Sequence, residues 1–165
     1  MAARHEYQLI LSTFRPLENS ILDSTIQINR LRPSDAEALA QLMLFAYRGT
    51  IDDDGETIED ARAEIAAFLN GERGGPPLPN LSRLAFIDEQ LVGACLISYW
   101  ADRNMPIIGY VLTHPNWKQR GLGRLLLNNA LSALREEGYQ EVRAMITTGN
   151  IPSERLLGGA GFQRI

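Results

Sequence analysis

The residues of this chain best suited to chemistry form a short basic loop rich in glycine, Lys118-Gln119-Arg120-Gly121-Leu122-Gly123, with Arg124 directly after it. An amphipathic helix is predicted to begin inside this loop. The N-terminus of a helix carries backbone N–H groups without partners and the positive end of the helix dipole. Glycines at 121 and 123 let a phosphate approach those donors, and the basic side chains add positive charge. The residues alone therefore predict a site for a phosphate or a diphosphate.

A simpler interpretation of the loop stays open, namely a tight strand-to-helix turn in which the glycines serve only the backbone. Two better-known phosphate motifs are excluded. The Walker pattern Gly-x-x-x-x-Gly-Lys-Ser/Thr is absent. A dinucleotide fingerprint needs a βαβ unit, whereas the strands predicted before this loop are antiparallel.

Hydrophobic periodicity predicts the elements that must position the loop. Strands are expected over 25–31, 82–88, 91–100, 106–113, 141–146 and 161–165, and helices over 36–47, 57–70, 121–137 and 152–157. The order is one strand, two helices, three antiparallel strands, and then helix, strand, helix, strand. This order predicts an α/β (α+β) domain with a mixed central sheet flanked by helices.

Two local features of these helices are specific enough to be tested. Ser34 and Glu37 have the spacing of a capping box at the start of the first helix. The core side of the helix over 121–137 is expected to carry six apolar residues. They are Leu122, Leu125, Leu126, Ala130, Ala133 and Leu134.

Residues 1–24 are interpreted as an N-terminal extension to a domain over 25–165. The extension contains one apolar stretch, from Tyr7 to Phe14, which fits an additional strand, a dimer arm or a loosely held tail. The edge at the predicted last strand is expected to be short, or to be filled by this stretch or by a second subunit. A homodimer is therefore compatible with the sequence.

Composition limits the partners. The net charge of −4 argues against nucleic acid as the main partner. No apolar run approaches the roughly 20 residues that cross a bilayer, and the start of the chain lacks a signal-peptide pattern, so a cytoplasmic protein is expected. Cys95 stands alone in an apolar strand and His5 is far from His114, so no metal site is predicted.

The segment from Gly109 to Arg124 resembles motif A of the GNAT acetyltransferase superfamily, which has Arg/Gln-x-x-Gly-x-Gly/Ala after a strand that ends in a His-Pro-like turn. Downstream, Asn150 to Leu157 followed by Gly161-Phe162 resembles motif B of the same superfamily. The predicted element order also matches, and the resemblance covers roughly residues 25–165.

This resemblance implies a binding site for acetyl-CoA and assigns its residues. The backbone of the strand end would pair with the pantetheine arm, the loop amides would hold the pyrophosphate, and Asn150 would bind the pantetheine. Ser153 replaces a common alanine and would cap its helix or touch a phosphate. The implied cofactor-binding residues are Val111, Leu112, Thr113, Lys118, Gln119, Arg120, Gly121, Leu122, Gly123, Arg124, Asn150 and Ser153.

The catalytic residues are not assigned, because the chain departs from the superfamily at two positions. Leu157 stands where members often place a tyrosine that protonates the departing thiolate, and Ile107 stands where some carry a glutamate that acts as base. Tyr110 and His114 are the remaining candidates. A water chain, or an acid such as Asp102 or Glu56, is the other route for the proton.

The resemblance implies an N-acetyltransferase that moves an acetyl group from acetyl-CoA to an unidentified primary amine by direct attack. Polyamines, aminoglycosides, amino acids, peptide N-termini and protein lysines all remain open as acceptors. The acidic loop from Asp52 to Glu56 is either a solvated loop or an attractor for a cationic amine. The two missing catalytic residues favour the alternative of a non-catalytic acyl-CoA-binding or sensor domain.

Overall fold

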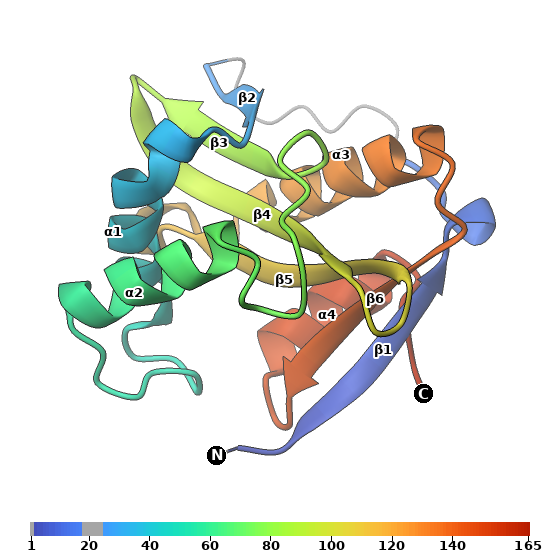
Figure 1. Ribbon diagram of the computed structural model, residues 1–165. Coiled ribbons are helices and arrows are strands. Elements are labelled where there is room, and N and C mark those ends of the chain that lie inside the picture. The colour runs from blue at the N-terminus through green and yellow to red at the C-terminus, as the bar shows by residue number, and fades with distance from the viewer. Residues whose placement is uncertain (1, 18–24) are drawn as a thin grey trace.

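The computed structural model describes residues 2–17 and 25–165, and its strands form one seven-stranded sheet in the order β2-β3-β4-β5-β6-β1-β7. The strands are β1 Arg4–Ile10, β2 Gln27–Arg30, β3 Arg83–Ile87, β4 Gln90–Trp100, β5 Met105–Thr113, β6 Glu141–Thr147 and β7 Gln163–Arg164. The helices are α1 Ala36–Tyr47, α2 Ile58–Leu69, α3 Leu122–Glu136 and α4 Ile151–Gly159. Every helix and strand expected within 25–165 is present, and the mixed-sheet fold is confirmed (Figure 1).

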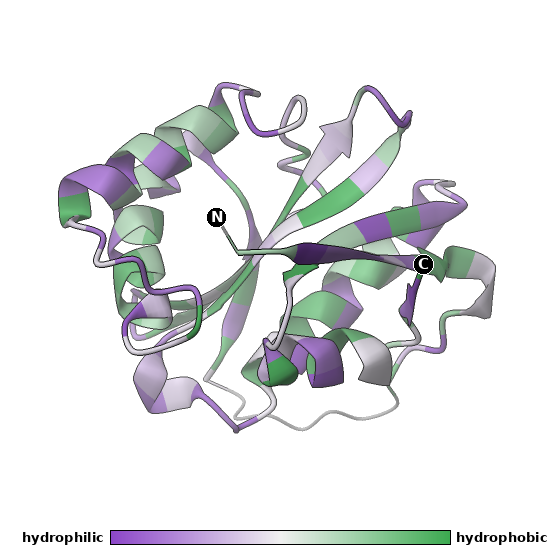
Figure 2. Cartoon of the chain, turned by 90° about the horizontal axis from the view of Figure 1, so that it is seen from below, coloured by the Kyte–Doolittle hydropathy of each residue, from purple (hydrophilic) through white to green (hydrophobic). Residues whose placement is uncertain are grey.

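The helices cover both faces of the sheet (Figure 2). One core packs α1 and α2 against β3, β4 and β5, and Leu39, Ile65 and Leu96 are among its buried members. The other core packs α3 and α4 against the opposite face, with Leu126 and Leu157 inside it. None of the helices in the described part of the chain combines the length and apolarity that crossing a membrane requires.

The apolar stretch of the N-terminal extension forms a strand of the same sheet. β1 runs antiparallel to β6 from Arg4, opposite Thr147, to Ile10, opposite Glu141, and its other edge pairs with β7. Leu11 begins a short 3₁₀ turn, and Phe14 follows with only 2% of its surface exposed. The extension is therefore an additional strand, as one of the sequence alternatives predicted, but it lies between β6 and β7, and the short β7 remains the edge strand.

This placement explains why the predicted core side of α3 was partly wrong. Leu127 and Leu131 are buried, whereas Leu125 and Ala133 are only partly so. The N-terminal segment packs along α3, and Leu11 and Phe14 share a core with Leu127 and Leu131. A helix covered on a second side buries more of its circumference than its sheet-facing stripe alone.

The start of α1 also differs from the prediction. Ser34 lies in a 3₁₀ turn over Pro33–Asp35, and it is Asp35 that accepts a hydrogen bond from the Arg32 N–H at 2.8 Å. At the start of α2, Thr57 and Asp60 form a capping box, in which they exchange backbone-to-side-chain bonds of 2.8 and 3.2 Å.

The sheet opens between its two parallel strands. β5 and β6 pair only at Ile107 with Arg143 and at Ile108 with Ala144. Beyond these pairs, β5 follows β4 as far as Thr113, while β6 follows β1 as far as Thr147. The register of β4 against β5 shifts here, because Leu96 faces Tyr110 while Ile97 faces Ile108. Gly109 is thus an extra residue, and such a bulge bends the strand.

Candidate functional site

The basic glycine loop turns sharply between β5 and α3. His114 opens a 3₁₀ turn over Pro115–Trp117, and its Nδ1 accepts from the Asn116 N–H at 3.2 Å. Gln119 and Gly121 then adopt left-handed backbone conformations, with φ of 62° and 82°. These two turns bring the chain back on itself just before α3 begins at Leu122.

The amides at the start of α3 are free for an anion. The Leu125 N–H donates to the Gly121 carbonyl at 3.0 Å, which is the first bond of the helix. The three preceding amides, from Leu122 to Arg124, have no carbonyl one turn earlier to receive them. They carry the positive end of the helix dipole, so the geometry suits a diphosphate.

Gly123 faces the space between β5 and α4. A Cβ atom built on this glycine would lie 3.5 Å from Thr113 Oγ1 and 3.7 Å from both Val111 Cγ1 and Leu156 Cδ2. These are ordinary contact distances, so the space takes a methyl group and little more. Without a side chain at 123, the α3 amides lie beside the edge of β5 that β6 leaves unpaired.

The two loop glycines should respond oppositely to alanine. Gly121→Ala places a residue with a Cβ atom in the left-handed backbone conformation, and this is expected to lower the free energy of unfolding by about 1–2 kcal/mol. Gly123→Ala lies inside α3 and is expected to leave that energy unchanged or raise it by up to about 1 kcal/mol. Urea unfolding of both variants tests this, and equal losses would contradict it.

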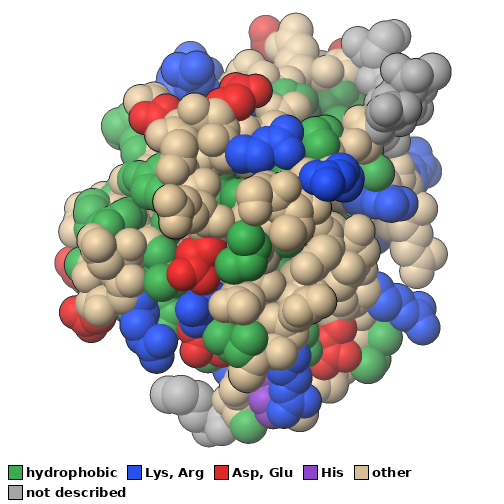
Figure 3. Space-filling view, turned by 90° about the vertical axis from the view of Figure 1, so that its right-hand side faces the viewer, with side chains coloured by type: hydrophobic (Ala, Val, Ile, Leu, Met, Phe, Trp, Pro, Cys, Tyr) green, Lys and Arg blue, Asp and Glu red, His purple; other side chains and the backbone are tan. Residues whose placement is uncertain are grey.

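The predicted basic residues do not all face one point. The Lys118 ammonium donates to the Ala46 carbonyl at the end of α1, at 3.0 Å. The Arg120 guanidinium lies over the Trp117 ring, 5.1 Å from its centroid. Within the described residues nothing pairs with Arg124, which projects from the first turn of α3. Although the net charge is −4, a row of Lys and Arg side chains crosses the upper part of the face in Figure 3, and others lie lower on the same face.

The motif B residues lie on the opposite side of the opening. Asn150 caps α4 through its Oδ1, which accepts from the Ser153 N–H at 3.2 Å. The expected capping role of the Ser153 side chain was therefore wrong, and Asn150 fills it. Asp52 crosses from the loop after α1 and accepts from Asn150 Nδ2 at 3.0 Å and from Thr147 Oγ1 at 2.7 Å.

On the α2 side of the opening, Tyr110 forms a chain of polar contacts that the sequence did not indicate. Its hydroxyl donates to Glu64 of α2, and Arg73 binds the two Glu64 carboxylate oxygens at 2.9 and 2.7 Å. Burial, and then the bond to Glu64, raise the pKa of Tyr110, while the Arg73 bonds lower the pKa of Glu64. The phenol is therefore neutral, with its proton directed at a carboxylate.

The other catalytic candidates are placed less favourably. His114 is a turn residue, packed against the Phe45 ring at 5.8 Å between centroids. Leu157 is buried in the α3 core. Asp102 lies in the turn between β4 and β5, at the far end of β5 from Thr113.

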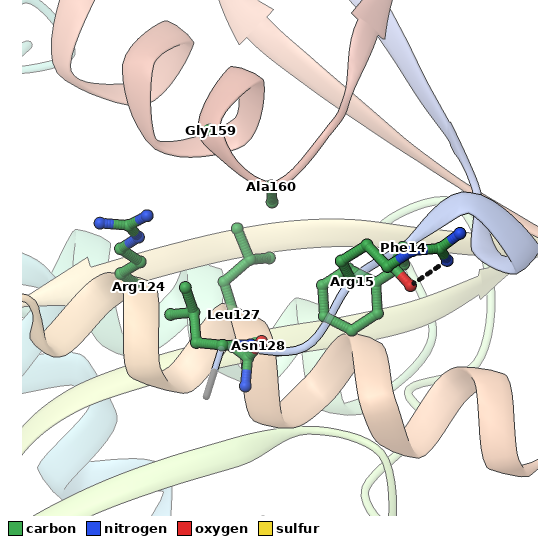
Figure 4. Close-up of a pocket in the computed structure, with 8 residues that line it drawn as sticks. Phe14, Arg15, Arg124, Leu127, Asn128, Gly159 and Ala160 are labelled. Carbon is green, nitrogen blue, oxygen red and sulfur yellow. Dashed lines mark hydrogen bonds between the residues drawn. The ribbon is translucent and has the colours of Figure 1, made fainter. Parts of the chain in front are cut away.

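A small hollow of about 20 Å³ opens beside the first turns of α3 (Figure 4). The N-terminal segment, α3 and the end of α4 supply its walls. The lining residues are Phe14, Arg15, Leu17, Arg124, Leu127, Asn128, Gly159 and Ala160. Only Arg124 belongs to the predicted site. The hollow therefore touches the predicted site through this one residue, and no sequence pattern indicated that residues 14–17 would border it.

Cys95 is fully buried, and burial raises the pKa of its thiol to about 12. The reactive form is the thiolate, so the folded protein is expected not to react with iodoacetamide at about pH 8. In concentrated urea the same thiol should take up one equivalent, which mass spectrometry measures. Rapid labelling of the folded protein would contradict the core assignment.

Comparison with known proteins places this site in a family. Residues 37–162 match the Acetyltransferase (GNAT) family. No curated protein matches the chain. Among solved structures, a GCN5-related N-acetyltransferase from Sphaerobacter thermophilus superposes with a TM-score of 0.72 at 20% identity, over 98% of this chain and 48% of that one.

Two shorter proteins share the fold along most of their length. A GNAT family acetyltransferase from Brucella melitensis, solved with acetyl-CoA, has a TM-score of 0.62 and 22% identity over 85% of this chain and 86% of that one. The ribosomal-protein-S18-alanine N-acetyltransferase from Escherichia coli has a TM-score of 0.63 and 17% identity, over 82% of this chain and 76% of that one.

The chain spans about half the length, or less, of the first three structures it matches, so these likenesses establish its fold and not a whole-protein activity. The family match covers both the glycine loop and the Asn150 segment. This chain belongs to the GNAT acetyltransferase family.

Proposed function

We propose that this protein is an N-acetyltransferase that moves an acetyl group from acetyl-CoA to a primary amine by direct attack. One observation carries the proposal. The free amides at the start of α3 lie beside the edge of β5 that the opening of the sheet leaves unpaired. A diphosphate and an extended amide-containing arm, joined as in coenzyme A, match these two features in that order.

In this proposal the chain holds the donor at three places. The amides from Gln119 to Arg124 bind the diphosphate. The backbone of Val111, Leu112 and Thr113 pairs with the pantetheine arm as an added strand. The start of α4, with Asn150 and Ser153, lines the thioester end. Lys118 supports the loop from its bond to α1 and acts on the phosphates as a more distant charge.

The chemistry follows from what the nearby groups donate and accept. The attacking amine must be unprotonated, although its ammonium form has a pKa of ~10, and the proton that it sheds on becoming an amide passes through solvent to the departing thiolate. Tyr110 already donates to Glu64, so its remaining capacity is to accept a hydrogen bond from that amine. The Val111 N–H stabilises negative charge on the carbonyl oxygen. The thiolate, of pKa ~8.5, leaves without an acid, which agrees with leucine at 157.

Binding and turnover test the proposal separately. Calorimetry should detect coenzyme A and acetyl-CoA, and ATP should raise the melting temperature less than acetyl-CoA does. Release of free thiol should then depend on one of a panel of amines that includes a polyamine, an aminoglycoside, an amino acid and a lysine peptide. Absence of coenzyme A binding refutes the proposal, and equal stabilisation by ATP indicates a general nucleotide site instead.

The second candidate is a non-catalytic acyl-CoA-binding or sensor domain. It is favoured by the apolar residues at two positions where related enzymes carry catalytic groups, Ile107 and the buried Leu157. It predicts tight binding of acetyl-CoA with no thiol release for any amine. Light scattering with and without acetyl-CoA would also show whether a homodimer forms.

A further inference from the structure

The Tyr110 hydroxyl lies at the opening of the sheet and is held there by α2. In the chain, Tyr110 comes just after Ile108, the last residue of β5 that pairs with β6. Its ring packs edge-on against Phe68 of α2, with 5.8 Å between the ring centroids, and its hydroxyl donates to Glu64 Oε1. The ring and the hydroxyl are therefore both fixed, while the residue as a whole stays partly exposed.

Glu64 is in turn held by Arg73, which follows α2 in the chain. Arg73 donates to Glu64 Oε1 at 2.9 Å and to Oε2 at 2.7 Å. A two-pronged contact of this kind fixes the plane of the carboxylate. The two side chains are 46% and 31% exposed, and ion pairs so exposed contribute little to stability. The more specific effect of the pair is on the phenol, because every proton in the series Arg73, Glu64, Tyr110 points at the carboxylate.

The charges around the phenol preserve this direction of donation. The Arg73 bonds are the largest influence on Glu64, and they hold the pKa of its carboxyl below the ordinary value. Burial, and then the bond to Glu64, raise the pKa of Tyr110. Glu64 is thus a carboxylate and a weak base, so its effect on Tyr110 is to orient it. The other charged or titratable groups that act on these side chains or on their neighbour in α1 are Arg4, Tyr47, Asp52 and Glu56.

We propose that Glu64 is a positioning residue for acetyl transfer, which holds the Tyr110 hydroxyl so that it turns a lone pair toward the attacking amine. The inference rests on the proposed function. A phenol has one proton to donate and accepts in its remaining directions. A freely rotating hydroxyl could donate to the amine nitrogen and occupy the lone pair that must attack. With Glu64 in place the nitrogen is the donor, and its lone pair faces the acetyl carbon.

Neither side chain changes its protonation in this step. The N–C bond forms as the C–S bond breaks, and the proton of the amine passes through solvent to the thiolate. Glu64 therefore acts only through Tyr110. This sets it apart from a general base, whose removal would change the dependence of the rate on pH.

A double-mutant cycle tests the proposal, with acetyl-CoA and whichever amine of the panel gives the fastest release of thiol. Glu64→Ala and Tyr110→Phe should each lower kcat about tenfold and leave the KM for acetyl-CoA unchanged. The double variant should lose no more than either single variant, because Glu64 acts through the phenol. Losses that multiply would overturn the proposal. Glu59→Ala is the matched control, since Glu59 is also on α2 and bound to an arginine, and its kcat should not change.

Two further readouts separate positioning from a structural or a basic role. Between about pH 6 and 9 the loss in Glu64→Ala should be the same at every pH, and loss of the acidic limb would identify a base instead. Ultraviolet titration needs no acceptor. In Glu64→Ala one tyrosine should ionise at lower pH than before, and this change should be absent when Tyr110→Phe is added. An unchanged titration overturns the proposal.

Failure of the proposed function would look different. Calorimetry should give the same affinity for coenzyme A in the unaltered protein and in all these variants, because none of them alters the glycine loop. If the unaltered protein binds no coenzyme A, or releases no thiol with any amine of the panel, the proposed function fails and the inference falls with it. If binding and turnover are normal in Glu64→Ala, only the role of Glu64 is refuted.

Discussion

Reversing the charge of Arg124 with Glu is expected to weaken coenzyme A binding about 100-fold while the melting temperature stays the same or rises slightly. The change in affinity and the change in stability have opposite signs because both depend on the positive end of the α3 dipole. Arg124 is the third residue of α3, where a helix favours an acid by about 0.3–1 kcal/mol and disfavours a base. A glutamate here should therefore stabilise the helix.

The same glutamate acts against a bound diphosphate. It removes a charge-assisted contact, worth about 1.5–3 kcal/mol, and places a carboxylate beside amides that would otherwise receive phosphate oxygens. A loss of about 2.7 kcal/mol is 100-fold in the dissociation constant. Calorimetry measures the affinity, and thermal unfolding without ligand measures the stability.

Arg30→Glu is the matched control for this variant. It changes the net charge by the same amount, but Arg30 is exposed on β2, at the opposite end of the sheet from β1 and β7. Its affinity should fall by no more than about twofold, because exposed charges farther apart than the Debye length are largely screened. A similar loss in both variants would mean that overall charge, rather than a site at α3, governs binding.

The sequence predicted the glycine loop well because the signals there are local. A glycine after a basic run, followed by an apolar stripe, indicates where α3 begins. Gly121 does adopt the left-handed conformation that glycine tolerates. The family motifs lie within the same short segments. The chain order of helices and strands could be read in the same way, from period and breakers alone.

The acceptor side of the site could not be predicted, because it is made of contacts between distant segments. Tyr110 and Glu64 are 46 residues apart, and Asp52 and Asn150 are 98 apart. Glu64 looks in the sequence like any exposed acid on an amphipathic helix. Only the bulge at Gly109 and the packing of α2 against β5 bring it to the phenol. Periodicity contains no information about such pairs.

The role of the N-terminal stretch was similarly undetermined, since an apolar run of eight residues fits a strand or an arm equally well. The structure places it between β6 and β7, where it separates the last strand from the rest of the sheet. The same segment then borders the hollow beside α3. One stretch outside the family match therefore completes the sheet and supplies a wall near the proposed donor site.

Removing residues 1–24 is accordingly expected to abolish cooperative folding, and coenzyme A binding with it. Three side chains of this stretch, Leu9, Leu11 and Phe14, are at most 2% exposed. Burying each of them contributes about 1.5–3 kcal/mol, or roughly 5–9 kcal/mol together. That is comparable with the whole stability of an ordinary domain, about 5–15 kcal/mol. Urea unfolding followed by circular dichroism should show no sharp transition for the shortened chain.

Point variants and a peptide make this test independent of whether the shortened chain is soluble. Leu9→Ala should cost about 2–5 kcal/mol in the full chain, whereas Ile10→Ala, next to it and 42% exposed, should cost less than about 1 kcal/mol.

A peptide of residues 2–17 added to the shortened chain should restore coenzyme A binding, because it supplies both β1 and the wall at Arg15. A shortened chain that unfolds at the same urea concentration as the full protein would instead establish 25–165 as an autonomous domain. The first strand would then be dispensable to the fold.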